Sequence, residues 1–136
     1  MGKSCIDDIL EQMREYLSRR NDIAFAFLFG SVAAGHRNVL SDLDLAIFFD
    51  GPLDFFKITD MREEISGIFG LETDIVALNS ASPIIRMQVL KKGVLLVKRD
   101  PRAYNNFFVN TVKEYDDLKR SRREIENNIL RGRIYA

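Results

Sequence analysis

Two carboxylates stand in a segment whose other residues have the character of a buried strand. Asp42 and Asp44 are two positions apart, and an apolar run over residues 45–49 follows them. Because strand side chains alternate between the two faces, both carboxylates project to the same side. They repel each other and burial penalises each charge, so a cation should complete the site. Oxygen ligands with little nearby sulfur or imidazole favour Mg²⁺ or Mn²⁺, and magnesium commonly shares its coordination with phosphate, so the pair suggests a nucleotide site.

A third acidic residue, Asp74, lies on another predicted strand, in the segment LETDIVAL. If that strand lies beside the one that carries Asp42 and Asp44, three carboxylates meet at one edge of the sheet. Two metal ions about 3.5–4 Å apart would then clamp the attacking and leaving oxygens of an in-line displacement. In that arrangement Asp74 is also a candidate to take the proton from an attacking hydroxyl.

A Gly30-Ser31 pair closes the apolar run that precedes the carboxylates. Glycine lets the backbone approach a phosphate closely, and successive N–H groups at a turn that opens a short helix form an anion site. Ser31 adds a hydroxyl donor, so a triphosphate is expected between this turn and the metal ions. Each motif is weak alone. Their order, with Ser41 directly before the Asp-x-Asp pair, is much more specific.

Apolar periodicity and turn residues predict alternating helices and strands that place these groups. In chain order we expect a helix after Ser4, strands over 23–29 and 43–49, a helix over 55–69, a strand over 73–78, a helix from Ser82-Pro83 to Gly93, a strand over 94–97 and a long helix over about 101–131. The apolar stripe predicted for the long helix is Phe108, Val112, Tyr115, Leu118, Ile125 and Ile129, interrupted by Arg122. Met61 and Met87 are interpreted as core residues. The pattern favours a single α/β or α+β domain over residues 1–136, with helices covering the sheet.

The composition excludes several classes of protein. Twenty basic residues balance twenty acidic ones, so no global field attracts nucleic acid or a membrane surface, and no direct nucleic-acid binding is expected. The longest uncharged stretch, residues 23–36, is too short to span a bilayer. One cysteine rules out an intrachain disulfide and fits a cytoplasmic protein, and the single histidine, His36, is interpreted as a loop residue.

The segment GSVAAGHRNVLSDLDLAI, residues 30–47, resembles the motif of the polymerase-β-like nucleotidyltransferases. That motif is a Gly-Ser pair, a ten-residue spacer and Asp-x-Asp, and this chain has the same spacing. The small size, the Ser-Asp-x-Asp-Leu form and the closing RGRIYA are similar to the minimal nucleotidyltransferase (MNT) group, which includes the MntA-type antitoxins.

The resemblance implies a mixed sheet of about four strands flanked by helices. It places Gly30 and Ser31, with Ser41, at the triphosphate, and it makes Asp42, Asp44 and Asp74 ligands of divalent metal, with two Mg²⁺ ions expected. The implied reaction transfers a nucleotidyl group from an NTP, with ATP favoured, to an acceptor hydroxyl and releases pyrophosphate. Antitoxin members pair with a HEPN-domain ribonuclease toxin and modify one of its tyrosines with AMP, so a HEPN partner is implied here.

Two alternatives stay open. This chain has Ala34 where many members carry a basic residue, so the first alternative is a catalytically weak antitoxin that neutralises its toxin by stoichiometric binding. The second is a small-molecule nucleotidyltransferase, which we rank lower because one helix after Pro101 leaves little material for an acceptor domain. The sequence does not fix the acceptor, the preferred base, the number of nucleotides added or the oligomeric state. Phe107-Phe108 and the interrupted stripe leave room for an interface with a second copy or another protein.

Overall fold

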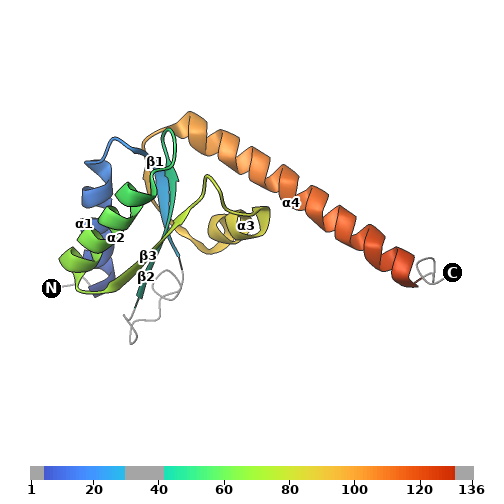
Figure 1. The fold of residues 1–136 in the computed structure, drawn as a ribbon, viewed down its shortest axis with the longest axis horizontal. Coiled ribbons are helices and arrows are strands. Elements are labelled where there is room, and N and C mark those ends of the chain that lie inside the picture. Colours follow the sequence, from blue (N-terminus) through green and yellow to red (C-terminus); the bar gives the residue numbers. More distant parts are fainter. Residues whose placement is uncertain (1–4, 30–41, 131–136) are drawn as a thin grey trace.

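The structure is a computed structural model, and it describes residues 5–29 and 42–130. Its elements are α1 (Cys5–Ser18), β1 (Ile23–Phe29), β2 (Asp42–Phe49), α2 (Phe55–Phe69), β3 (Glu72–Ala77), α3 (Pro83–Lys92), β4 (Val94–Lys98) and α4 (Pro101–Leu130) (Figure 1). Within the described residues, four strands form one sheet in the order β3-β2-β1-β4. Strand β2 is parallel to β3, whereas β1 is antiparallel to both of its neighbours. The predicted mixed sheet with flanking helices and a long C-terminal helix is confirmed.

Local signals in the sequence set the ends of the helices that border the sheet. Asp54 caps α2, because its side chain accepts hydrogen bonds from the backbone N–H groups of the next turn. Gly70 ends the same helix in the left-handed region, with φ of 64°, a conformation that a residue with a Cβ rarely adopts. Ser82 caps α3, and Pro83 occupies its first turn. The helix boundaries predicted at Gly70 and Ser82-Pro83 are therefore confirmed.

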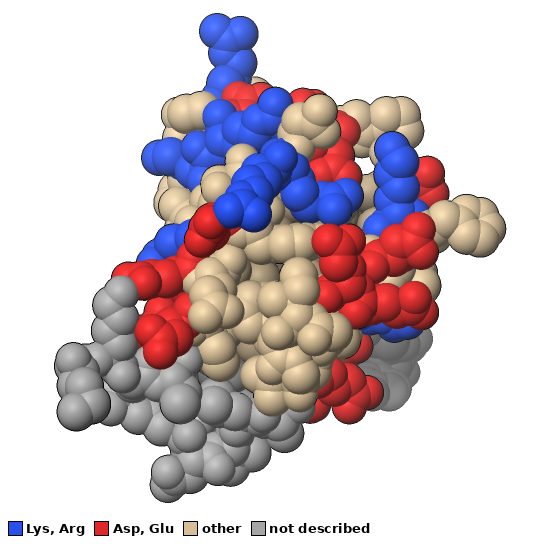
Figure 2. Space-filling view, turned by 90° about the vertical axis from the view of Figure 1, so that its left-hand side faces the viewer, with Lys and Arg blue, Asp and Glu red and all other residues tan. Residues whose placement is uncertain are grey.

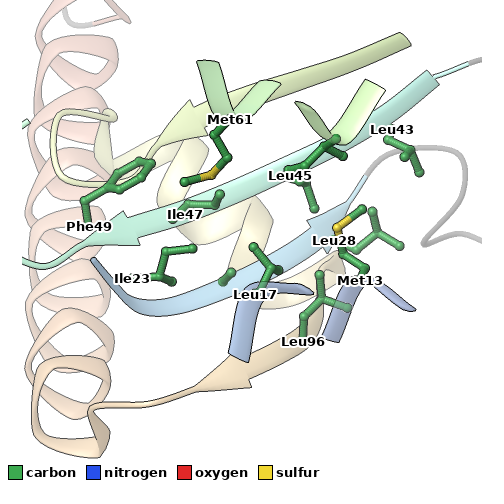
Figure 3. Packing of buried hydrophobic residues seen from close by; sticks show 12 residues of the cluster. Met13, Leu17, Ile23, Leu28, Leu43, Leu45, Ile47, Phe49, Met61 and Leu96 are labelled. Atoms are coloured by element: carbon green, nitrogen blue, oxygen red, sulfur yellow. The ribbon is translucent and has the colours of Figure 1, made fainter. Parts of the chain in front are cut away.

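One face of the sheet packs against α1 and α2 (Figure 3). Apolar side chains at alternate positions of β2 meet Met13 and Leu17 from α1 and Met61 and Ile65 from α2. These residues are almost completely inaccessible to solvent, so this layer forms a continuous hydrophobic core. The assignment of Met61 to the core is thus correct, and Met87 is also buried, on α3.

The opposite face is covered by α3 and by the first half of α4, through a cluster of aromatic side chains. Phe25 lies at its centre, with ring centroids 5.0 Å from Phe48, 5.3 Å from Tyr104 and 5.0 Å from Phe107. The first of these contacts is stacked and the second is edge-to-face, two favourable arrangements of aromatic rings. Strand β1 thereby anchors the start of α4 to the sheet.

The apolar stripe predicted for the last helix is wrong by about one residue where α4 meets the sheet. Phe107 and Thr111 are buried there, whereas Phe108 is 45% exposed. A shift of one residue turns the contact face by about 100°, and the aromatic cluster around Phe25 selects the face that carries Phe107. Residues 116–127 are all exposed, and α4 runs past α3 away from the sheet (Figure 1).

None of the helices in the described part of the chain has a stretch long and apolar enough to cross a membrane.

Candidate active site

Strand pairing brings two of the candidate carboxylates directly side by side. In the parallel pair of β2 and β3, Asp44 lies opposite Asp74, and Asp42 lies opposite Glu72. Neighbouring strands are about 4.8 Å apart, so residues in register are close neighbours. The condition stated for a three-carboxylate site, that the strand of Asp74 lies beside that of Asp42 and Asp44, is therefore met.

The three carboxylates also share one face of the sheet. Leu43 and Leu45 are fully buried in the core against α1 and α2, so Asp42 and Asp44 project to the other face. Thr73 is likewise buried, which turns Asp74 the same way as Asp44. The site lies where β2 and β3 begin, on the face that α3 and α4 cover further along the sheet (Figure 1).

Asp44 occupies the most enclosed position of the three. It is half-buried, whereas Asp42 and Asp74 are exposed. Burial raises the pKa of the Asp44 carboxyl above its ordinary value, and the negative charges of Asp74 and Asp42 raise it further. Burial is the larger cause, and the smaller contribution from Asp74 and Asp42 is what neighbouring carboxylates of like charge produce.

The donor set fits a hard divalent cation. Three carboxylates from two adjacent strands supply oxygen ligands from a rigid support, as Mg²⁺ and Mn²⁺ require. Among the described residues, no three acidic, histidine or cysteine side chains already converge on one point.

The glycine-serine motif directly follows the strand that borders the site. Phe29, the last residue of β1, pairs with Asp44, so the chain leaves β1 next to the carboxylates. The predicted phosphate contacts Gly30, Ser31 and Ser41 lie outside the described residues, and their role stays a prediction. Figure 2 shows that, on the face that carries α1 and α2, Lys and Arg side chains gather toward one end.

Glu72 is an acidic residue at this edge that the sequence interpretation passed over. It lies in register with Asp42 and, two residues before Asp74, on the same face of β3. The Glu-x-Asp spacing in LETDIVAL indicates that Glu72 and Asp74 share a face of their strand. Only the pairing of β2 with β3 shows that Glu72 also lies beside Asp42. A fourth carboxylate therefore stands at the exposed edge of the site.

Three carboxylates on one face of a parallel strand pair, beside the end of a preceding strand, are suited to metal-assisted transfer of phosphate-linked groups. The chain belongs to the family described as polymerase beta, nucleotidyltransferase, whose model matches residues 11–102. The protein is thus a nucleotidyltransferase, as the sequence motif predicted. The matched region extends from α1 to the start of α4 and contains all three carboxylates.

The chain is also similar to individual members of this family and to solved structures. The chain is 25% identical over 124 residues to the protein adenylyltransferase MntA of Shewanella oneidensis, covering 90% of this chain and 85% of that protein. It is 27% identical to the protein adenylyltransferase MntA of Aphanizomenon flos-aquae, covering 90% and 89%. Among solved structures, a toxin–antitoxin with AMP-PNP matches with a TM-score of 0.72 at 23% identity, covering 90% of this chain and 98% of that one. A complex of a tri-AMPylated Shewanella oneidensis HEPN toxin with its MNT antitoxin matches with a TM-score of 0.70 at 21% identity, covering 92% and 98%.

Proposed function

We propose that this protein transfers AMP from ATP to a tyrosine hydroxyl of a cognate HEPN-domain ribonuclease toxin and thereby acts as its antitoxin. The observation that carries the proposal is the register of β2 and β3, which pairs Asp44 with Asp74 and sets Asp42 on the same face. Relatives named protein adenylyltransferase MntA, matched over most of their length, support AMP as the transferred group. Structural neighbours that are toxin–antitoxin complexes, one with a tri-AMPylated HEPN toxin, support the partner.

In the proposed reaction the oxygen of the acceptor hydroxyl attacks the α-phosphorus of ATP. The bond from that phosphorus to the oxygen bridging to the β-phosphate breaks, and pyrophosphate leaves with the bonding electrons. Asp74 accepts the proton of the attacking hydroxyl, because it is an exposed carboxylate that lies in register with Asp44 on the neighbouring strand. The products are an AMP-modified tyrosine and pyrophosphate.

Asp42, Asp44 and Asp74 would hold two Mg²⁺ ions. The ions would neutralise the charge that develops on the attacking and leaving oxygens. The pairing of β2 with β3 holds the backbone of these three residues in fixed register. Little ordering of the site is therefore required when the nucleotide binds. Gly30, Ser31 and Ser41 are proposed to bind the triphosphate, since the chain enters this segment from Phe29 beside Asp44. We place the reaction in the cytoplasm, where ATP is available.

A second candidate is neutralisation of the toxin by stoichiometric binding without transfer. The exposed second half of α4 favours it, since this helix carries apolar side chains that contact no other element of the described structure closely enough to bury them. Binding through α4 would be independent of the three carboxylates. The two candidates therefore separate when a carboxylate is neutralised.

The experiment is intact-mass spectrometry of the HEPN partner after incubation with this protein, ATP and Mg²⁺. We expect a gain of one or more AMP units with the wild-type protein and no gain with Asp42→Asn. Tandem mass spectrometry should place the modification on tyrosine. A stable complex with an unmodified partner would reject transfer and favour the stoichiometric binder.

A further inference from the structure

The second half of α4 presents a regular apolar seam that the rest of the described structure leaves uncovered. Tyr115, Leu118, Ile125 and Ile129 lie at a and d positions of two consecutive heptads and at the a position that follows them, with Arg122 at the central a position. Leu118 is 44% exposed, Ile125 is 56% exposed and Ile129 is 42% exposed. An a/d spacing of apolar residues is the pattern by which one helix packs along another.

A small hollow marks the end of this seam that is nearer the sheet. Ile84 from α3 and Tyr115, Leu118, Lys119 and Arg122 from α4 line a cavity of about 170 Å³. Three of these residues have apolar or aromatic side chains, and the other two are basic. The hollow offers a place for an apolar side chain at the point where α4 leaves the body of the protein.

The cations around this hollow give the seam a defined charge. The Nζ atoms of Lys91 and Lys119 each lie 5.5 Å from the centre of the Tyr115 ring, so two ammonium groups flank that ring. Arg122 stands within the seam itself, between Leu118 and Ile125. A charged residue at an a position requires an oppositely charged group on the facing helix if it is to be buried without a large penalty.

We propose that Tyr115–Ile129 is the docking surface for an α-helix of the partner protein, one that presents an apolar seam with a carboxylate facing Arg122. The inference rests on the proposed function, because the acceptor must be held by this protein while its hydroxyl is modified. The length of the seam provides contact at a distance from the reacting groups. Binding energy from such a remote contact helps to position an acceptor.

The observations favour this occupant over two others. In a parallel pair of two copies Arg122 would face Arg122, and in an antiparallel pair it would face Leu118 or Ile125, so neither arrangement places a carboxylate at the seam position that faces Arg122. An anionic membrane surface is disfavoured because Asp116, Asp117, Glu124 and Glu126 are interleaved with the cations of the same segment. A protein helix with its own carboxylate meets both the apolar and the charged requirement.

The test uses the full-length protein and its HEPN partner, with the dissociation constant measured by isothermal titration calorimetry. Arg122→Glu and Leu118→Glu should each weaken the complex by about 30-fold or more, the loss expected when a central contact or a desolvated charge pair is broken. Replacing the facing carboxylate of the partner by lysine should restore binding to Arg122→Glu. Arg120→Glu is the matched control, because it makes the same charge change two residues away, on the opposite side of the helix, and should leave the constant within about threefold.

Two further readouts keep the possible results distinct. A thermal shift with ATP and Mg²⁺ should be unchanged in all of these variants, which shows that the nucleotide site is intact. A complex that Arg122→Glu and Leu118→Glu leave unchanged would overturn the docking surface and leave the proposed transfer standing. A complex that Arg122→Glu and Leu118→Glu weaken, but in which the partner gains no AMP, would support the docking surface and overturn the proposed transfer. Failure of the wild-type protein to bind the partner, or a dimer of this chain that Leu118→Glu dissociates, would also overturn the inference.

Discussion

Asp44 lies opposite Asp74 in the parallel pairing of β2 with β3, with both side chains on the face turned away from α1 and α2. Residues 30 positions apart in the sequence thereby become one site. The pairing also explains why Asp44 has a raised pKa, since burial and two neighbouring carboxylates all act against its charged form. Because the sheet holds these like charges close together, they repel one another, and a bound cation would reduce that repulsion.

Asp44→Asn should make the metal-free protein more stable at neutral pH, because it removes one of three repelling charges. Differential scanning calorimetry without divalent metal should show a higher Tm for the variant. The same variant should lose the increase in Tm that ATP and Mg²⁺ give to the wild-type protein, since ligand binding stabilises only a fold that retains the site. A lower Tm for metal-free Asp44→Asn would contradict the proposed repulsion.

The acid sensitivity of the fold should depend on the pair of Arg20 and Asp22. Arg20 donates two hydrogen bonds to this carboxylate, at 3.0 and 2.9 Å, and holds the pKa of Asp22 below its ordinary value. A lowered pKa in the folded state means that the stabilisation is present above the ordinary pKa near 4 and is lost as the pH falls through the folded-state value. The Tm of the wild-type protein should therefore fall more steeply below about pH 4 than that of Asp22→Asn, whose side chain does not titrate.

Scans of Tm against pH for both proteins measure this difference. Asp60→Asn is a suitable control, since it removes an exposed carboxylate from α2. Identical slopes for the wild-type protein and Asp22→Asn would show that the pair contributes nothing to acid stability.

Thr111 should be replaceable by valine with a gain in stability. Its side chain is fully buried, and its hydroxyl has no hydrogen-bond partner within the described part of the chain. A buried hydroxyl without a partner costs about 1–3 kcal/mol, and valine has nearly the same shape. Urea denaturation should thus show a higher free energy of unfolding for Thr111→Val, by about 1 kcal/mol. Thr111→Ser, which keeps the hydroxyl and loses the methyl group, should be less stable than the wild-type protein.

The order of elements and most of their boundaries could be predicted because each depends on neighbours in the sequence. Asp54, Gly70 and Ser82 act on the backbone of their own turn, and the alternation of Leu43 and Leu45 with the carboxylates needs no tertiary contact. The same alternation placed Asp42 and Asp44 on one face before the sheet was known.

Features that depend on the tertiary fold could not be predicted in the same way. Which face of α4 meets the sheet depends on the aromatic cluster at Phe25, so Phe107 is buried where the sequence favoured Phe108. Glu72 and Asp42 become neighbours only when β3 pairs with β2 in this register. The adjacency of Asp74 to Asp44 was stated as a condition of the site, and the sheet order supplies it.

The most direct test of the account is whether Asp42, Asp44 and Asp74 act as one catalytic unit. We would measure single-turnover rates of AMP transfer to the HEPN partner for the three single Asn variants and for Asp44→Asn/Asp74→Asn, with Asp60→Asn as the charge-matched control. Each single change should lower the rate by at least about 100-fold, and the double variant should be little worse than either single variant, because groups that act as a unit are not additive. A rate for Asp74→Asn equal to that of the control would contradict the account, since β3 would then contribute no group to the reaction.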